Sequence, residues 1–183
     1  MEKFESLVGI KPKKLLFQLG TLSLTIGSAL MLWAILRILT NVESPVVVVL
    51  TQSMEPAYKR GDTLFITNWD EPTVPGDVMV FQIKTEVIPI VHRAMKVQER
   101  SGNKFQENDY YLLTKGDNNS IDDRGLYPSR KLWLHKEDVI GKIRAFCPYM
   151  GYVTIALNDN PPLKYAVLAC LAFLVIFSND PDE

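Results

Sequence analysis

The distribution of apolar and polar positions divides the chain into an apolar segment near each end and a middle of short apolar runs separated by polar turns. The first apolar run, residues 15–36, contains no charged side chain in 22 positions. As a helix that rises about 1.5 Å per residue it would extend about 33 Å, enough to cross a bilayer core of about 30 Å. The pattern predicts a transmembrane anchor helix over residues 15–38.

A cleaved signal peptide is the alternative interpretation of this run. The apolar part of a signal peptide usually has only about 7–15 residues and precedes a cleavage site with small residues, whereas Arg37 and Ile38 follow here. The length therefore favours an uncleaved anchor. By the positive-inside rule, the basic flank before it predicts that residues 1–14 are cytosolic. The body of the protein would then lie on the opposite side of the membrane: lumenal, periplasmic or extracellular. The basic residues of this flank are Lys3, Lys11, Lys13 and Lys14.

The second apolar run, residues 165–178, is shorter than the first. Its 14 residues would form a helix of about 21 Å, too short for an ordinary bilayer core. A second short membrane segment, an interfacial helix and a helix packed on a partner all remain open, and the membrane interpretations are favoured. We expect an interfacial segment over 147–163, a short apolar helix over 164–178 and a solvated acidic tail over 179–183.

Residues 44–146 have the pattern of a β-rich domain. Segment 46–50 is apolar at each position, typical of a strand buried on both faces, and Pro89 inside segment 87–96 predicts an edge strand or a bulge. Short strands separated by turn signals such as Pro75-Gly76-Asp77 predict a small, strongly bent, mainly β fold. The predicted strands are 46–50, 62–67, 78–83, 87–96, 110–115 and 139–146.

The charge balance excludes one large class of partners. Lysine and arginine total 20, aspartate and glutamate total 21, and the net charge is −1. A chain without a basic excess gives no reason to expect a nucleic-acid surface. The two cysteines, Cys147 and Cys170, do not distinguish an oxidising from a reducing compartment.

A serine follows the four consecutive valines of VVVVLTQSMEP, at the end of a predicted strand. The hydroxyl of such a serine, Ser53, becomes a useful nucleophile only beside a base that a third group orients. The chain has two histidines. Taken alone, His92 in IPIVHR would be a core histidine, and His135 in WLHKED would be solvated.

Acidic residues follow in LLTKGDNNSIDDRGLY, and each alone is typical of a turn. Ser53, His92 and Asp123 would together supply a nucleophile, a base and an orienting acid. Their order along the chain differs from the orders in chymotrypsin, subtilisin and the α/β-hydrolases. Spacing alone does not establish that the three side chains meet.

Three motif blocks occur in order behind the apolar helix: SPVVVVLTQSMEPAYKRGD, IPIVHR and LLTKGDNNSIDDRGLY. They resemble the catalytic subunit of the eukaryotic endoplasmic-reticulum signal peptidase complex, and the resemblance extends from about residue 20 to about residue 176. It implies a signal-peptidase-type β-fold and a serine endopeptidase of the endoplasmic-reticulum membrane that cuts preproteins after small residues. The implied partners are signal peptides, small non-catalytic membrane subunits and the lipid bilayer, with no cofactor or metal.

The resemblance also implies roles for individual residues. Ser53 corresponds to the nucleophile, and His92 to the general base, for which the bacterial branch has a lysine. Asp123 corresponds to the acid that orients the histidine, and Asp117 to a supporting acid near the site. We expect cleavage to fall below about pH 6, because free imidazole gains a proton near pH 6.5 and a protonated histidine is not a base.

An oxyanion hole is implied as well. Its donors would be the backbone N–H of Ser53 and the hydroxyl of Thr51. Gln52, between them, departs from the glycine that family members often have there.

Three other classes remain as alternatives: a non-catalytic anchored module that binds extended peptides, a membrane serine protease that cuts mature proteins, and a structural subunit of a membrane complex. Loss of cleavage on substituting Ser53 would argue against the first.

Overall fold

The computed structural model describes residues 12–69, 71–83, 88–99, 110–128 and 131–177. Two compact units are present: Leu36–Ile155 forms one, and Met1–Ile35 with Ala156–Glu183 forms the other. Of the predicted cytosolic segment, residues 1–11 lie outside the described residues, as does the predicted acidic tail over 179–183. The elements are α2 (Pro12–Thr40), β1 (Val46–Val48), β2 (Thr63–Thr67), β3 (Val78–Phe81), β4 (Ile90–Glu99), β5 (Tyr110–Lys115), η1 (Asp123–Gly125), β6 (Leu134–His135), η2 (Lys136–Asp138), β7 (Val139–Cys147), α3 (Tyr152–Asp159) and α4 (Pro161–Phe177).

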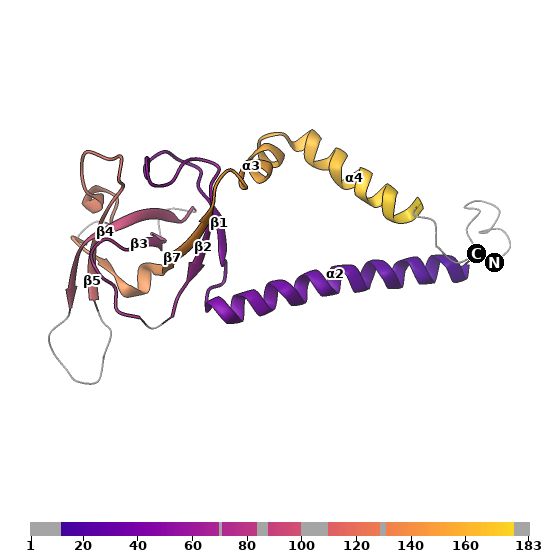
Figure 1. Ribbon diagram of the computed structural model, residues 1–183, viewed down its shortest axis with the longest axis horizontal. Coiled ribbons are helices and arrows are strands. Elements are labelled where there is room, and N and C mark those ends of the chain that lie inside the picture. The colour runs from indigo at the N-terminus through magenta and orange to yellow at the C-terminus, as the bar shows by residue number, and fades with distance from the viewer. Residues whose placement is uncertain (1–11, 70, 84–87, 100–109, 129–130, 178–183) are drawn as a thin grey trace. The chain divides into compact units, whose positions relative to one another are not determined.

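The strands form one antiparallel sheet in the order β1-β2-β7-β3-β4-β5-β6 (Figure 1). Three of its strand pairs contain a register shift, and such shifts bend a strand and increase its twist. The predicted fold class is confirmed: a mainly β fold with an N-terminal apolar helix and short C-terminal helices. The shifts fall between Phe65 and Ile66, between Val80 and Phe81, and between Ala94 and Lys96.

The main core lies beneath the strands β3, β4 and β5. All four residues of β3 are buried, because this strand lies between β7 and β4 inside the sheet. Its Phe81 packs with Ala94 of β4 and Leu112 of β5 in one cluster. This close packing holds β4, which carries His92, and β5, which leads to Asp117 and Asp123, in fixed positions.

Two predictions about individual strands are wrong. Segment 46–50 was expected to be buried on both faces. Among the described strands, however, β1 lies at the edge of the sheet beside β2 alone, and its three valines are half-buried. Leu50 is 47% exposed. For segment 87–96 the edge-strand alternative is wrong, because β4 pairs with strands on both sides. A register shift does occur in β4, but it falls between Ala94 and Lys96, and Pro89 precedes the strand. A central strand has no place for a residue that lacks an N–H group, so β4 begins after the proline.

Helix α2 is the one helix in the described part of the chain that is long and apolar enough to cross a membrane, over Leu16–Thr40. Its few hydroxyls bond within the helix: Thr21 donates to the carbonyl of Phe17 at 3.0 Å and Thr25 to that of Thr21 at 2.9 Å. A bilayer core contains no water, so polar groups of a membrane helix need hydrogen-bond partners within the protein, as these hydroxyls have.

The C-terminal end of α2 is capped by the loop after β2. The indole N–H of Trp69 donates to the carbonyl of Leu39 at 2.9 Å, and the backbone N–H of Asn68 donates to that of Thr40 at 2.9 Å. Asn41 then leaves the helix with a φ of 54°, the left-handed conformation typical of a helix end. Otherwise orphaned helix carbonyls therefore have donors.

Helix α4 contains 17 residues, and it begins before the predicted residue 164. Proline is favoured in the first turn of a helix, where the missing N–H group is not needed, and Pro161 and Pro162 occupy that turn.

Candidate active site

Ser53 lies in the loop that connects β1 to β2. Backbone bonds close the base of this loop, from Val49 N to Asp62 O and from Gly61 N to Val49 O, both at 2.9 Å. Met54 is 1% exposed and anchors the loop in the protein, whereas Ser53 beside it is only half-buried. The loop therefore presents the serine hydroxyl at an accessible surface.

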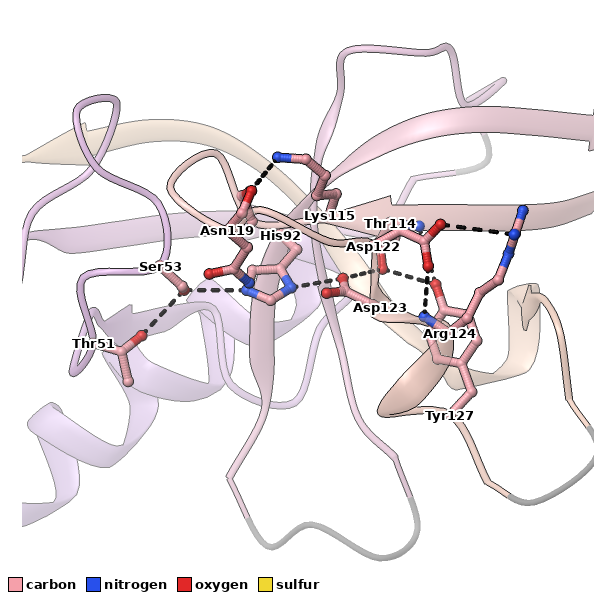
Figure 2. Close-up of polar contacts among 11 residues, drawn as sticks. Thr51, Ser53, His92, Thr114, Lys115, Asn119, Asp122, Asp123, Arg124 and Tyr127 are labelled. Atoms are coloured by element: carbon pink, nitrogen blue, oxygen red, sulfur yellow. Dashed lines mark hydrogen bonds and ion pairs between the residues drawn. The ribbon is translucent and has the colours of Figure 1, made fainter.

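His92 lies on β4 and faces that hydroxyl. Its Nδ1–H donates to Asp123 Oδ2 at 2.6 Å, and its Nε2 is 3.1 Å from Ser53 Oγ (Figure 2). Because a carboxylate can only accept, the proton of the neutral ring resides on Nδ1 and Nε2 holds a lone pair toward the serine. This arrangement can remove a proton from the hydroxyl of Ser53.

Asp123 is the first residue of η1, and it is 1% exposed. Its Oδ2 accepts from His92 Nδ1 and also from Thr114 Oγ1, each at 2.6 Å. A buried carboxylate needs such donors because burial removes its hydration. The three residues singled out in the sequence thus lie within hydrogen-bond distance in one row.

Thr114 and Tyr127 lie behind Asp123. Both occur in the block LLTKGDNNSIDDRGLY, but nothing in its pattern predicted a role for either residue. Thr114 N donates to the phenol oxygen of Tyr127 at 3.0 Å, and the two hydroxyls also lie 3.0 Å apart (Figure 2). Strand register is the signal that would have found Thr114. It lies opposite Ala94, and Ala94 is two residues after His92, so period-two alternation places all three on one face.

Thr51 lies on the other side of Ser53. Its Oγ1 is 3.2 Å from Ser53 Oγ (Figure 2). With the serine proton directed at His92, Thr51 is the donor in this pair. The hydroxyl of Thr51 therefore lies next to the atom that would attack a substrate.

Asp117 pairs with Arg93, and among the described interactions it has no hydrogen bond to the imidazole of His92. Arg93 Nε donates to Oδ1 at 2.8 Å and Nη2 to Oδ2 at 2.6 Å, while Nη1 donates to the carbonyl of Gly76 at 2.8 Å. The hydrogen bonds from Arg93 hold the pKa of the Asp117 carboxyl below its usual range. A bidentate pair fixes orientation as well as charge.

The residues after Asp117 contact the backbone beside the serine. Asn118 N donates to the carbonyl of Ser53 at 2.9 Å, and Asn118 Nδ2 donates to that of Gln52 at 3.2 Å. Lys115 Nζ donates to the carbonyl of Asn119 at 2.6 Å. This loop, residues 115–119, therefore supports the Ser53 loop from one side.

Gly116 makes this close approach possible. A Cβ at this position would lie 2.7 Å from Ser53 O, 2.8 Å from Asn119 Nδ2 and 2.9 Å from His92 Nε2. Real Cβ atoms do not come that close, so any side chain here would displace the serine or the histidine.

The second histidine has a different environment. His135 contacts the ring of Tyr111 edge to face, with the centroids 4.9 Å apart. Across the described segments, no group of three or more His, Cys, Asp or Glu side chains could hold a metal ion.

Comparison with known proteins gives relatives along nearly the whole chain. The signal peptidase complex catalytic subunit SEC11C of Homo sapiens is 45% identical over 181 residues, which cover 98% of this chain and 92% of the relative. The signal peptidase complex catalytic subunit SEC11 of Schizophyllum commune is 43% identical over 179 residues, covering 92% of this chain and 93% of the relative. A family model described as the signal peptidase C-terminal short helix matches residues 152–177, which contain α3 and α4.

Proposed function

The chain belongs to the family of signal peptidase complex catalytic subunits and is a signal peptidase, and from this premise we propose that it works as a serine endopeptidase through Ser53, His92 and Asp123. One observation carries the proposal: Ser53 Oγ is 3.1 Å from His92 Nε2, and His92 Nδ1 is 2.6 Å from Asp123 Oδ2. Nucleophile, base and orienting acid thus have the mutual geometry that acyl transfer needs.

The reaction proceeds in two halves. Ser53 Oγ attacks the scissile carbonyl carbon while His92 Nε2 takes the serine proton, and Asp123 stabilises the imidazolium that forms. The proton then passes from His92 to the leaving amine, and the peptide bond breaks to give an acyl-enzyme. Water repeats the sequence: His92 takes its proton, the hydroxide adds to the acyl carbon, and Ser53 leaves with the proton returned.

The oxyanion of each tetrahedral intermediate needs donors. We assign these to the backbone N–H of Ser53 and to the hydroxyl of Thr51, whose position 3.2 Å from Ser53 Oγ supports the assignment. In other hydrolases, loss of one such donor lowers kcat by about 10²–10³-fold.

Asp117 has a supporting role in this proposal. It holds Arg93, and the loop that contains it donates from Asn118 N to the carbonyl of Ser53 at 2.9 Å. The pair thereby keeps the nucleophile at its distance from the base. Misplacement of reacting groups by about 1 Å costs about 10²-fold in rate, so such support matters.

The substrate is the extended end of a signal peptide, and cleavage follows a small residue. Strand β1 is an edge of the sheet and leads directly into the Ser53 loop, so it offers free backbone groups beside the site. An extended peptide can pair with such an edge through main-chain hydrogen bonds.

The proposed location is the endoplasmic-reticulum membrane. Helix α2, with Lys13 in its first turn, acts as a single anchor with a cytosolic N-terminus, and the sheet domain lies in the lumen. We propose the predicted boundaries as well. They are a cytosolic segment over 1–14, an anchor over 15–38, a catalytic domain over 44–146, an interfacial segment over 147–163 and a C-terminal helix over 164–178. Since the relatives are named subunits of a complex, small non-catalytic membrane subunits are the proposed partners.

Substitution of the proposed nucleophile tests this function. Membranes that lack their own catalytic subunit receive the full-length chain as wild type, Ser53→Ala or Ser120→Ala, and are given a presecretory substrate. We expect the wild type and the exposed control Ser120→Ala to cut after a small residue, and Ser53→Ala to be silent at equal expression. Equal cutting by Ser53→Ala and the wild type would reject the mechanism.

A further inference from the structure

Two buried hydroxyls behind Asp123 have no part in the mechanism described so far. We propose that Thr114, backed by Tyr127, is a positioning residue that fixes the Asp123 carboxylate in the orientation in which it serves His92. This inference rests on the proposed function and deepens it, because it extends the row of three residues to five.

Burial makes these hydroxyls important to the carboxylate. Thr114 is 0% exposed, Tyr127 is 6% exposed and Asp123 is 1% exposed. Water cannot replace a donor lost at such a position, and a buried carboxylate left short of donors is costly. The Thr114 hydroxyl, 2.6 Å from Asp123 Oδ2, therefore supplies a bond that solvent would not restore.

The direction of each bond in this row follows from donor and acceptor chemistry. Thr114 N can only donate, so the phenol oxygen of Tyr127 accepts there, at 3.0 Å. A carboxylate can only accept, so the proton of the Thr114 hydroxyl points at Asp123. The phenol proton of Tyr127 is then left to donate to Thr114 Oγ1, 3.0 Å away.

The phenol keeps that proton at neutral pH. Burial raises the pKa of Tyr127, and the hydrogen bonds with Thr114 oppose that rise less strongly. The row is thus ordered from Tyr127 to Thr114 to Asp123, with His92 donating from the other side.

Both donors use the same carboxylate oxygen, Oδ2, and this has two consequences. The carboxylate is held in one rotational orientation, since the oxygen that faces His92 must also face Thr114. The Thr114 hydroxyl also takes a share of the negative charge on that oxygen. Removing it should lower kcat through loss of orientation and leave a more basic partner for the imidazole, which moves the acid limb of the pH profile upward.

The other charged groups around the imidazole stay constant in this comparison. Asp117 remains paired with Arg93. Lys115, on the same strand as Thr114, and His92 are both close enough to Asp117 to lower the pKa of its carboxyl. None of these groups contacts the Thr114 hydroxyl among the described interactions, so a shift of the acid limb in a Thr114 variant reports on Asp123.

The test uses the full-length chain in its membrane complex, with kcat, KM and the pH profile measured for a preprotein substrate. Thr114→Val removes the hydroxyl and keeps the shape, Thr114→Ser keeps the hydroxyl, and Tyr127→Phe removes the backing donor. The matched control is Thr73→Val, because Thr73 is 7% exposed and its hydroxyl has no hydrogen-bond partner among the described residues.

We expect Thr114→Val to lose about tenfold in kcat, which is the effect of one hydrogen bond to a charged group, with KM nearly unchanged. Its acid limb should move to higher pH, Thr114→Ser should recover most of the rate, and Tyr127→Phe should lose about threefold. Thr73→Val should cleave like the wild type.

Wild-type kcat and pH profile in Thr114→Val would overturn the inference, as would equal losses in Thr114→Val and Thr114→Ser, which indicate packing. If Thr114→Val fails to fold, Tyr127→Phe decides: a lower kcat with a moved acid limb supports the inference, and wild-type behaviour overturns it. Failure of the proposed function looks different, because Ser53→Ala would then retain activity.

Discussion

Two aspartates form hydrogen bonds with consecutive residues of strand β4, and the burial of the two aspartates differs. Asp123 bonds to His92, and the Asp123 side chain is 2% exposed. Asp117 bonds to Arg93, and the Asp117 side chain is 20% exposed. Because successive strand residues point to opposite faces, β4 directs the histidine into the protein and the arginine toward the open face.

The partners match these environments. On the buried face Asp123 is held by an imidazole and a neutral hydroxyl, so its charge remains available to the imidazole. On the open face Asp117 is neutralised by a guanidinium with two parallel bonds, so its charge is used to fix a loop. The comparison teaches that two consecutive residues of one strand can each bind an acid from another segment, one for electrostatics and the other for position.

The largest effect is expected from removing the charge on the buried face. Asp123→Asn keeps the shape, but a carboxamide can hold the imidazole in the wrong tautomer, and cleavage should fall by about 10³-fold or more. The measurement is kcat/KM at equal amounts of folded enzyme. Asp122→Asn is the neighbouring control, since the hydrogen bond and ion pair of Asp122 among the described residues are its cap of η1 and its contact with Arg124 at 3.8 Å. A loss below about tenfold in Asp123→Asn would remove the distinction between the two acids.

A smaller effect is expected where the open-face loop meets the serine. Gly116→Ala puts a Cβ 2.7 Å from Ser53 O, so the nucleophile must shift, and cleavage should fall by about 10²-fold. Gly125→Ala is the matched control, because nothing lies within 4 Å of a Cβ there. Equal rates for the two variants would show that the loop does not position Ser53.

The smallest effect concerns stability on the open face. The pKa of Asp117 is lowered by its hydrogen bonds with Arg93, relative to an unfolded carboxyl near 3.9. A lowered pKa means stability that is present above about pH 4 and lost as the pH falls through the lower folded value. Asp117→Asn should therefore cost about 1 kcal/mol at pH 7 and less at about pH 3, below the unfolded pKa.

Thermal unfolding of the wild type and of Asp117→Asn at both pH values measures this difference. Arg93→Gln should lose at least as much at pH 7, because it breaks the same pair and also the bond to the carbonyl of Gly76. A destabilisation of Asp117→Asn that stayed constant with pH would mean that packing, not charge, connects the loop to β4.

The sequence was sufficient to predict the fold class and to single out Ser53, His92 and Asp123, because each lies at a motif with a distinctive composition. The structure brings the three together, and their catalytic roles stay predictions. Thr114 and Arg93 lie in the same motif blocks, but their residue types alone did not predict a role. Each reads as an ordinary strand residue until the register, Ala94 opposite Thr114 and Arg93 opposite Lys115, assigns it to a face.

The burial of β1 was mispredicted for a related reason. Four consecutive valines predict an apolar strand, but they do not predict how many strands pair with it. That number depends on β2 and β7, which pair across about 80 residues of chain, as in Thr63 opposite Cys147. Pairing of this kind is invisible to local patterns.

The strand order has a consequence for the synthesis of this protein. Within the sheet, the β1–β2 pair that carries the Ser53 loop joins β3, β4 and β5 only through β7, the last strand to be translated. Such non-local pairing forms late, because a long loop must close before any contact stabilises it. In a nascent chain that has not yet released residues 139–147, the strands beside the serine and the histidine lack the strand that joins them in the finished sheet. We therefore expect the Ser53–His92 geometry to become stable only after β7 has paired with both β2 and β3.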